Sequence, residues 1–315
     1  MLRSIHRRLF LTGSFAYLVL MGRVAAPQPA NIVSGVRIGR GRMLVIEQDA
    51  SGRIVVFDSS TYRASNPTTS ADVVVVGSYC GMRVLAPIFT DGVKAVIATD
   101  GGIGKDEAGI NGLTHGETIG VPVAAIAAMS AETSNGRSTL LGEVSRANAQ
   151  ARALGVEPGM LAYEAAALLA MAPPGRPIPT VHETEGPVVV EETPNGRIWA
   201  SPGTTSISEK IPNDIVCSGS NASRVMSDGV QRMRAKGAIA NDAGIARNNT
   251  AVEGVMLLAE HGIPAASVST MSARLGEGLS TWNDGVLSVV NEVAAGLGVR
   301  VGMTAKAAAR LMLQS

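Results

Sequence analysis

The residues with the clearest chemical potential follow three apolar runs of the chain, at the point where each run ends. A serine hydroxyl can act as a nucleophile or orient a water molecule, and an aspartate can hold a nearby base. Open parallel sheets bind ligands at the carboxyl ends of their strands. If the runs are parallel strands, the polar residues at their ends therefore form one candidate site. The runs and their endings are Val73–Val76 with Gly77 and Ser78, Ala95–Thr99 with Asp100, Gly101 and Gly102, and Val121–Ala128 with Ser130.

The same residue types recur at a nearly fixed distance along the chain. Residues 72–146 match residues 214–288 at an offset of 142, with 21 identities in 75 positions. Residues 147–170 match residues 290–313 at an offset of 143, with 11 identities in 24 positions. This identity predicts an internal duplication, because repeats of fixed period reflect a structural unit used more than once. Ser220 and Asp242 stand in the second copy where Ser78 and Asp100 stand in the first.

The two copies differ at positions where a site could be specialised. Lys105 in the first copy corresponds to Arg247 in the second, and Glu132 corresponds to Arg274. A lysine can act as a base when desolvation lowers its pKa, whereas an arginine stays charged. Two arginines can bind a carboxylate through paired hydrogen bonds. Because the copies differ at these positions, a pocket between them would be asymmetric, with Lys105 and Glu132 on one side and Arg247 and Arg274 on the other.

These residues predict a small-molecule hydrolase that acts on an amide or cyclic amide bearing a carboxylate. Ser78 or Ser130 would be the nucleophile or orient an attacking water, and Lys105 would be the base, held by Asp100. Backbone amides at the strand ends would stabilise the oxyanion. The residues expected to bind the substrate are Gly101, Gly102, Ser220, Asp242, Arg247 and Arg274.

Two other functions are compatible with the same residues. A solute-binding or sensing protein without turnover would explain two similar units around one ligand. A lyase or isomerase would use Lys105 and Asp100 for proton abstraction. A structural interpretation stands beside all three, because Gly-Ser is ordinary turn chemistry and Asp100 or Asp242 can cap a following helix.

The motifs indicate no cofactor. Gly101–Lys105 does not fit the phosphate-binding loop, since Thr99 stands at the first glycine position and Asp106 follows the lysine. Four scattered His without paired spacing argue against a zinc site. A Mg²⁺ site built on Asp100, Asp106 and Glu107 is an alternative, because carboxylate oxygens are the ligands that Mg²⁺ prefers.

Composition limits the class of partner. The chain has 315 residues, of which 46% are hydrophobic and 17% charged, and a formal net charge of +1. So apolar a chain can bury a core, which excludes a disordered protein, and its near-zero charge argues against nucleic-acid binding. The expected partner is a small molecule, and a homo-oligomer is also compatible. The two cysteines exclude a disulfide scaffold, and Cys80 and Cys217 are expected to be buried thiols.

Residues 1–30 form a basic and apolar leader that contains four Arg and no Asp or Glu. Arg7-Arg8 before Leu-Phe-Leu resembles a twin-arginine export signal, and the apolar run is shorter than the ~20 residues of a stable membrane span. The alternatives are an Arg-rich transit peptide or a wrong start, with Met21 the true first residue. Export would place the chain in the periplasm; without it the chain stays in the cytoplasm.

The sequence predicts an α/β fold made of two tandem homologous units. Each unit is expected to begin with an antiparallel strand pair, Met43–Glu47 and Arg53–Phe57 in the first. Unbroken apolar strands that alternate with helices then predict a mainly parallel sheet with helices on both faces. In the first unit we expect helices over 82–89, 108–119 and 140–154 and a short one after Met160, with the two units packed about a pseudo-two-fold axis. The expected parts of the chain are the leader 1–30, a first repeat 31–171, a Pro-rich linker 172–179 and a second repeat 180–315.

Overall fold

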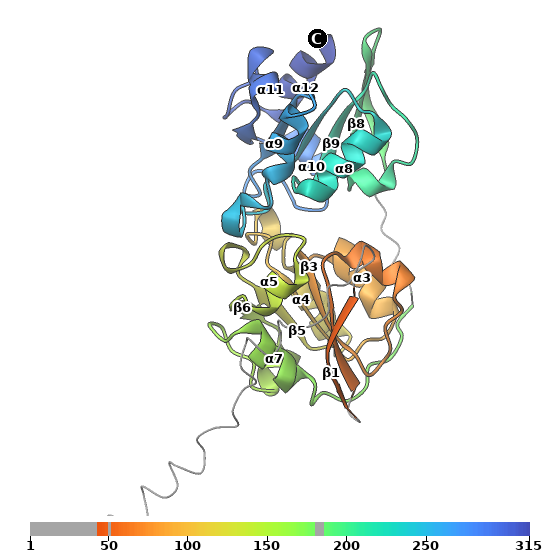
Figure 1. The fold of residues 1–315 in the computed structure, drawn as a ribbon, viewed down its shortest axis with the longest axis vertical. Coiled ribbons are helices and arrows are strands. Elements are labelled where there is room, and N and C mark those ends of the chain that lie inside the picture. The colour runs from red at the N-terminus through yellow and green to blue at the C-terminus, as the bar shows by residue number, and fades with distance from the viewer. Residues whose placement is uncertain (1–42, 50–51, 180–185) are drawn as a thin grey trace, which may run out of the picture. The chain divides into compact units, whose positions relative to one another are not determined.

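The computed structural model describes residues 43–49, 52–179 and 186–315 (Figure 1). All of them belong to one compact unit, Arg37–Ser315. The predicted leader, residues 1–30, lies outside the described residues. No helix in the described part of the chain is long and apolar enough to cross a membrane.

The first half of the chain forms a six-stranded sheet in which the strands lie side by side in chain order. The inner pairs β2–β3, β3–β4 and β4–β5 are parallel, while the outer strands β1 and β6 are antiparallel to their neighbours. The parallel strands are almost wholly buried, which is why they are continuous apolar runs. The strands are β1 Met43–Asp49, β2 Gly52–Phe57, β3 Val73–Tyr79, β4 Ala95–Thr99, β5 Val123–Ile126 and β6 Val144–Ala147.

The second half forms another six-stranded sheet with the same order and the same directions. Its inner pairs β8–β9, β9–β10 and β10–β11 are parallel, and its outer strands β7 and β12 are antiparallel. The strands are β7 Val188–Thr193, β8 Gly196–Ser201, β9 Ile215–Asn221, β10 Gly237–Asn241, β11 Ala265–Val268 and β12 Leu287–Val290.

Helices cover both faces of the first sheet. Val74 and Val76 of β3 point to the face covered by α3 (Met82–Thr90), where they share a core with Leu85. α4 (Asn111–Thr118) packs beside α3 on this face. The opposite face of β3 contacts α5 (Gly136–Leu140) and α7 (Ala162–Leu169). The alternation of side chains along a strand thus gives each face its own core.

The second sheet is covered in the same way. Cys217 and Ile239 share a core with α10 (Gly278–Asp284) and α12 (Ala305–Gln314), while Val216 and Ala238 share one with α8 (Arg224–Met233) and α9 (Glu253–Ala259). The predicted fold class, two α/β units with mainly parallel sheets and an initial antiparallel strand pair, is therefore confirmed. The matching element order is compatible with the predicted duplication; the domain boundaries and the pseudo-two-fold axis stay predictions.

One predicted helix is wrong. The segment expected to be helical over 140–154 contains the antiparallel strand β6, followed by the short helix α6 (Ala149–Ala153). Asn148 explains the break: its buried Oδ1 accepts from the backbone N of Ala151 at 3.0 Å, which caps α6, and from the N of Val123 at 3.0 Å, which ties the cap to β5. The predicted helix over 108–119 is confirmed only in its later part, since α4 begins at Asn111.

The structure also changes where the predicted repeat would shift from an offset of 142 to one of 143. β6 corresponds to β12 at an offset of 143, so the extra residue lies before the strand, not after residue 146. α10 has seven residues where α5 has five, and it contains the insertion. A helix absorbs an added residue more easily than a paired strand, because a shift of one residue reverses the faces of a strand.

Candidate functional site

Asp100, the predicted carboxylate at the end of β4, binds backbone amides. Its Oδ1 accepts from the N of Gly102 and from the N of Ala128, both at 2.9 Å. The buried carboxylate thereby joins its own turn to the end of β5. The role is that of a turn anchor, in line with the structural interpretation of the sequence. Asp242 repeats it, its Oδ1 accepting from Gly244 N at 3.1 Å and Thr270 N at 2.9 Å.

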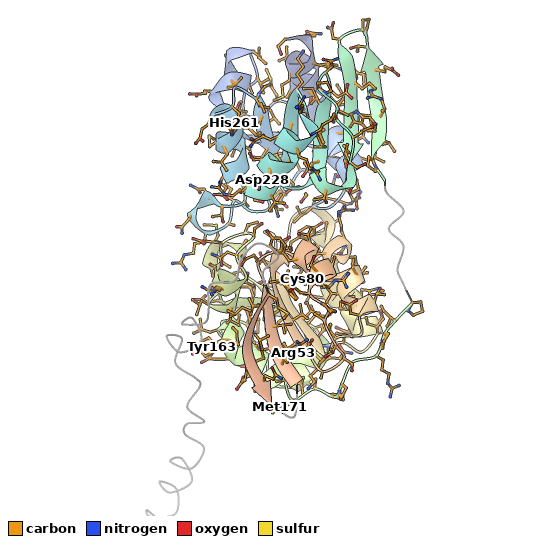
Figure 2. All side chains as sticks on the ribbon, turned by 45° about the vertical axis from the view of Figure 1, so that its right-hand side comes forward. Arg53, Cys80, Tyr163, Met171, Asp228 and His261 are labelled. Carbon is orange, nitrogen blue, oxygen red and sulfur yellow. The ribbon has the colours of Figure 1, made fainter. Side chains whose placement is uncertain are left out.

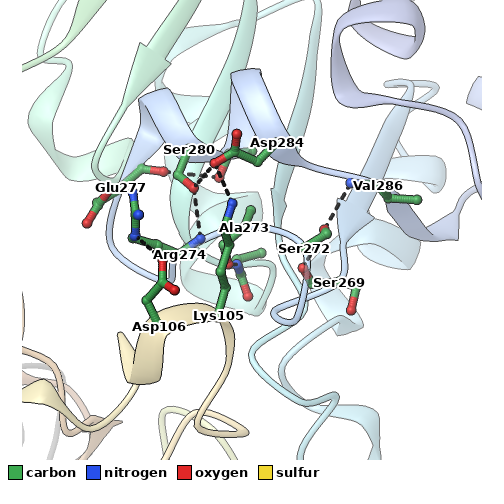
Figure 3. Close-up of polar contacts among 12 residues, drawn as sticks. Lys105, Asp106, Ser269, Ser272, Ala273, Arg274, Glu277, Ser280, Asp284 and Val286 are labelled. Carbon is green, nitrogen blue, oxygen red and sulfur yellow. Dashed lines mark hydrogen bonds and ion pairs between the residues drawn. The ribbon is translucent and has the colours of Figure 1, made fainter.

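Ser130 also holds backbone. Its Oγ donates to Ala127 O at 2.8 Å and accepts from Glu143 N at 2.9 Å, which fixes the 3₁₀ turn Ala128–Ser130 to the start of β6. Ser272 does the same in the second half, donating to Ser269 O and accepting from Val286 N (Figure 3). Each hydroxyl therefore holds two backbone groups, one as donor and one as acceptor.

Lys105, the predicted base, is held by Asp284 and not by Asp100. Its Nζ lies 2.9 Å from Asp284 Oδ2, which also accepts from Ser280 Oγ at 2.8 Å (Figure 3). These two hydrogen bonds lower the pKa of Asp284, the bond from Lys105 contributing most. Lys105 is thus the partner of an ionised carboxylate from the other half of the chain.

The two predicted carboxylate-binding arginines are not brought together by contacts. Arg274 Nε donates to Asp106 Oδ2 at 2.7 Å, and its Nη1 reaches Glu277 Oε2 at 3.4 Å (Figure 3). The hydrogen bond to Asp106 raises the pKa of Arg274 most, and the charge of Glu277 adds to the effect. Arg247 is exposed, and its side chain makes no hydrogen bond or ion pair with a residue that the structure describes.

The turns that follow Asp100 and Asp242 have an unusual backbone, repeated position by position. Ile103 and Ile245 have φ of 63° and 69°, a region that β-branched residues rarely adopt. Such strained positions persist only where the surroundings impose them, and they gather at functional or tightly packed sites. The positions with positive φ are Gly101, Gly102, Ile103, Gly104, Asp106 and Glu107 in the first turn, and Ala243, Gly244, Ile245, Ala246, Asn248 and Asn249 in the second.

These two turns contact each other. A Cβ built on Gly102 would lie 2.7 Å from Gly244 Cα, and a Cβ on Gly244 would lie 2.7 Å from Gly102 Cα. Lys105 N donates to Thr270 O at 2.8 Å beside this contact. Equivalent residues that touch each other are expected near a two-fold axis. Gly102, one of the glycines predicted to bind the substrate, therefore lies in a packed contact, and its N is already bound to Asp100.

A cavity of about 300 Å³ lies at the ends of β3 and β9 and combines residues from both halves. Nine of its eighteen lining residues carry a hydroxyl, and none of the lining residues in the described part of the chain is Asp, Glu, Lys or His. Of the predicted site residues, Ser78 and Ser220 line it; the other eight do not. The lining residues are Ser59, Ser60, Thr61, Arg63, Ala64, Ser78, Tyr79, Arg83, Val84, Pro87, Ser134, Gly203, Thr204, Thr205, Ser220, Asn221, Val225 and Met226.

Gly77 and Gly219 allow the close backbone packing that fixes the positions of Ser78 and Ser220. A Cβ on Gly77 would lie 2.5 Å from the backbone of both Asp58 and Asn135, so only glycine allows the end of β3 to pass between these loops. Gly219 meets the backbone of Glu277 at 2.4 Å in the same way. Ser78 Oγ then accepts from Ser60 N at 3.2 Å at the edge of the cavity. The recurring Gly-Ser pair is therefore partly a packing feature.

Sequence reasoning missed Arg83, Arg63 and the threonines of the 3₁₀ turn Thr204–Ser206. Arg83 lies in the second position of α3, where an arginine in a helix usually indicates a solvated face. A comparison of the two copies could have pointed to Arg83, because Val225 stands at the equivalent position of the second copy, at the offset of 142. Asp284, the partner of Lys105, has no such signal, since the insertion in α10 obscures its alignment.

The cysteines are buried, as expected. Cys80 is wholly buried at the end of β3, within the first sheet unit (Figure 2). Burial raises the pKa of its thiol, and the charge of Asp100 raises it further. Burial raises the pKa of Cys217 to about 12. Both thiols are therefore protonated near neutral pH and poor nucleophiles.

The residues suggested for Mg²⁺ do not converge. Asp100 is buried and bound to amides, whereas Asp106 is exposed and paired with Arg274. Within the described ranges there is no group of three or more His, Cys, Asp and Glu that could hold a metal ion. The Mg²⁺ site stays a prediction.

Comparison with protein-family models, with curated proteins and with solved structures found no match to this chain. Function must therefore be inferred from the site itself.

Proposed function

We propose that this protein binds a small polar molecule of the amide or carboxylate class in the hydroxyl-lined cavity at the ends of β3 and β9. The observation that carries the proposal is the presence of Ser78 and Ser220, equivalent residues of the two halves, in the lining of one cavity. A volume of about 300 Å³ is at the lower end of ligand pockets and suits a molecule of metabolite size.

The chemistry of the lining favours recognition over catalysis. Hydroxyls donate and accept hydrogen bonds, so nine of them can match both the C=O and the N–H groups of an amide. A hydrolase needs a base within hydrogen-bond reach of its nucleophile or water. The described lining residues include no His, Lys, Asp or Glu, and Lys105 is engaged with Asp284. A binding or sensing role is therefore our first proposal, and hydrolysis or proton abstraction stays a prediction.

The test is a binding and turnover assay on the full chain. Thermal shift and calorimetry would be run with a panel of small carboxylic acids, amides and cyclic amides, including 5-oxoproline and dihydroorotate. We expect at least one compound to bind, and Ser78→Ala or Ser220→Ala to weaken it roughly threefold to tenfold each, as the loss of one hydrogen bond implies. Ser145→Ala, a hydroxyl on β6 outside the cavity lining, is the matched control.

The same samples, followed by NMR, measure turnover. Binding without conversion supports the proposed role, whereas conversion abolished by Ser78→Ala or Ser220→Ala would restore the hydrolase hypothesis. If no compound binds, or if binding is unchanged in both serine variants, the cavity is not the site.

A further inference from the structure

The cavity is lined from both halves of the chain by residues at equivalent positions. β2 and β8 correspond at an offset of 144, and the 3₁₀ turns that follow them begin at the equivalent residues Ser60 and Thr204. β3 and β9 correspond at the offset of 142. Fourteen of the eighteen lining residues therefore form seven equivalent pairs. The pairs are Ser59 with Gly203, Ser60 with Thr204, Thr61 with Thr205, Ser78 with Ser220, Tyr79 with Asn221, Arg83 with Val225, and Val84 with Met226.

The residues that each half contributes to these pairs form one wall of the cavity. Three of the seven pairs carry a hydroxyl on both walls, namely Ser60 with Thr204, Thr61 with Thr205, and Ser78 with Ser220. Two of these pairs also match in exposure: Thr61 and Thr205 are both exposed. Ser78 and Ser220 are both half-buried. Each wall therefore carries one exposed and one half-buried hydroxyl at equivalent positions.

The 3₁₀ turn and the strand end lie together on each wall. On the first wall, Ser60 N donates to Ser78 Oγ at 3.2 Å, which ties the turn to β3. On the second wall, the turn Thr204–Ser206 contacts β9, the strand that carries Ser220. Equivalent groups that line one cavity from two sides are expected to be related by a two-fold axis, as in an isologous contact.

The charged residues of the described lining, Arg63 and Arg83, already have protein partners. Arg63 forms an ion pair with Asp91, and Arg83 Nη2 donates to Ser206 Oγ at 2.9 Å. The described lining residues include no Asp, Glu, Lys or His. The groups that the two walls share are therefore neutral hydroxyls, each of which can donate and accept a hydrogen bond.

A ligand with equal polar groups at its two ends can satisfy both walls at once. An amide suits such a wall, because its C=O accepts from one hydroxyl and its N–H donates to another. A ligand with a single amide would leave the hydroxyls of one wall against its apolar part. Polar groups that lose their partners on binding lower the affinity, so the two walls together favour the two-ended ligand.

We propose that the cavity binds one uncharged molecule with two equal amide groups, of the cyclic bis-amide class, with one amide on Ser78 and the other on Ser220. This inference rests on the proposed function and specifies the ligand class of the same cavity.

The test compares 2,5-diketopiperazine with 2-piperidone by calorimetry on the full chain. Both are six-membered rings, but the first has two equal amides and the second has one. We expect one molecule of 2,5-diketopiperazine to bind per chain, and 2-piperidone to bind at least roughly tenfold more weakly, because it leaves one wall unpaired.

The serine variants test whether both walls take part equally. Ser78→Ala and Ser220→Ala should each weaken the binding of 2,5-diketopiperazine by the same factor, roughly threefold to tenfold. The double variant should weaken it by about the product of the two factors, because the serines bind opposite ends of the ligand. Ser145→Ala, outside the cavity lining, should leave the affinity unchanged.

The outcomes separate this inference from the proposed function. Two molecules bound per chain, or 2-piperidone bound as tightly as 2,5-diketopiperazine, overturns the two-ended ligand but leaves the cavity as the site, and needs no variant to fold. A loss in only one of the serine variants also overturns it, since one wall would then be enough. If another compound of the panel binds and 2,5-diketopiperazine does not, the ligand class is wrong and the proposed function stands. If no compound binds, the proposed function fails, and this inference with it.

Discussion

The Asp100 carboxylate holds two loops through a single oxygen, and this predicts how it responds to substitution. Asp100→Asn keeps an Oδ1 that can accept from Gly102 N and Ala128 N, whereas Asp100→Ala leaves both amides without this partner, the one of Ala128 in a buried position. We expect the alanine variant to lose about 2–4 kcal/mol in the free energy of unfolding and the asparagine variant less than about 1 kcal/mol, measured in urea.

The same two substitutions at Asp242 provide a second test, because its Oδ1 accepts from the equivalent backbone N atoms of Gly244 and Thr270. Equal destabilisation by asparagine and alanine at position 100 would show that the charge, and not the acceptor, is what the fold requires.

The ion pair of Lys105 and Asp284 predicts a dependence on pH with a definite sign. The pKa of Asp284 is lowered in the folded chain, chiefly by the hydrogen bond from Lys105. The pair therefore stabilises the fold above the ordinary aspartate pKa of about 3.9, and this contribution is lost as the pH falls through the lowered value. Both side chains are about one third exposed, so we expect less than about 1 kcal/mol.

Lys105→Met should raise the pKa of Asp284 toward its ordinary value, measured by carboxylate NMR. The stability difference from the wild type, measured in urea, should be present at pH 7 and vanish near pH 2. Lys210→Met, an exposed lysine outside this cluster, serves as the control. An unchanged Asp284 titration would contradict the assignment.

Among the secondary-structure elements, the buried amide of Asn148 organises four segments. Besides its contacts to Ala151 and Val123, its Nδ2 donates to Val121 O at 2.8 Å and Leu113 O at 3.4 Å. Asn291 repeats the arrangement between α11 (Glu292–Gly296), β11 and Val255 of α9. We expect Asn148→Ala to cost about 3 kcal/mol in urea unfolding, since it removes a helix cap and leaves buried backbone groups unpaired.

Asn283→Ala, at an exposed position of α10, is the control and should change stability by less than about 0.5 kcal/mol. A similarly small effect at Asn148 would mean that water replaces the amide.

The elements also show what could be predicted from sequence. Buried parallel strands are largely apolar, so β3, β4 and β5 are visible as runs in the sequence. β6 is not, because only its first and last residues, Val144 and Ala147, are buried, and it lies at the sheet edge within an Ala- and Arg-rich stretch that favours a helix. Ser78 and Ser220, which line the cavity, were predicted from sequence because the same Gly-Ser pair recurs at an offset of 142. Arg83 was not, because its contact with Ser206 joins residues 123 positions apart.

For the molecule as a whole, the contact between Gly102 and Gly244 gives the sharpest prediction. Gly102→Ala would place a Cβ against the Cα of Gly244 at a φ of +74°. Gly120 has nearly the same φ, +75°, with nothing within 4 Å of its Cβ position. We expect Gly120→Ala to cost about 1 kcal/mol for the left-handed backbone and Gly102→Ala about 3 kcal/mol, because the clash is added.

Urea unfolding of the two variants isolates the contact, since the backbone penalty cancels in the difference. Gly244→Ala should match Gly102→Ala. Equal losses for Gly102→Ala and Gly120→Ala would mean that the two turns separate at little cost.

The two walls of the cavity belong to one polypeptide, and this has a consequence for how the site can vary. In a symmetric dimer of a single unit, every substitution would appear twice, so an arginine at position 83 would face a second arginine across the cavity. In this chain Arg83 and Val225 both line the cavity, and either can be replaced alone. Joining the units in one chain therefore doubles the number of wall positions that can change independently.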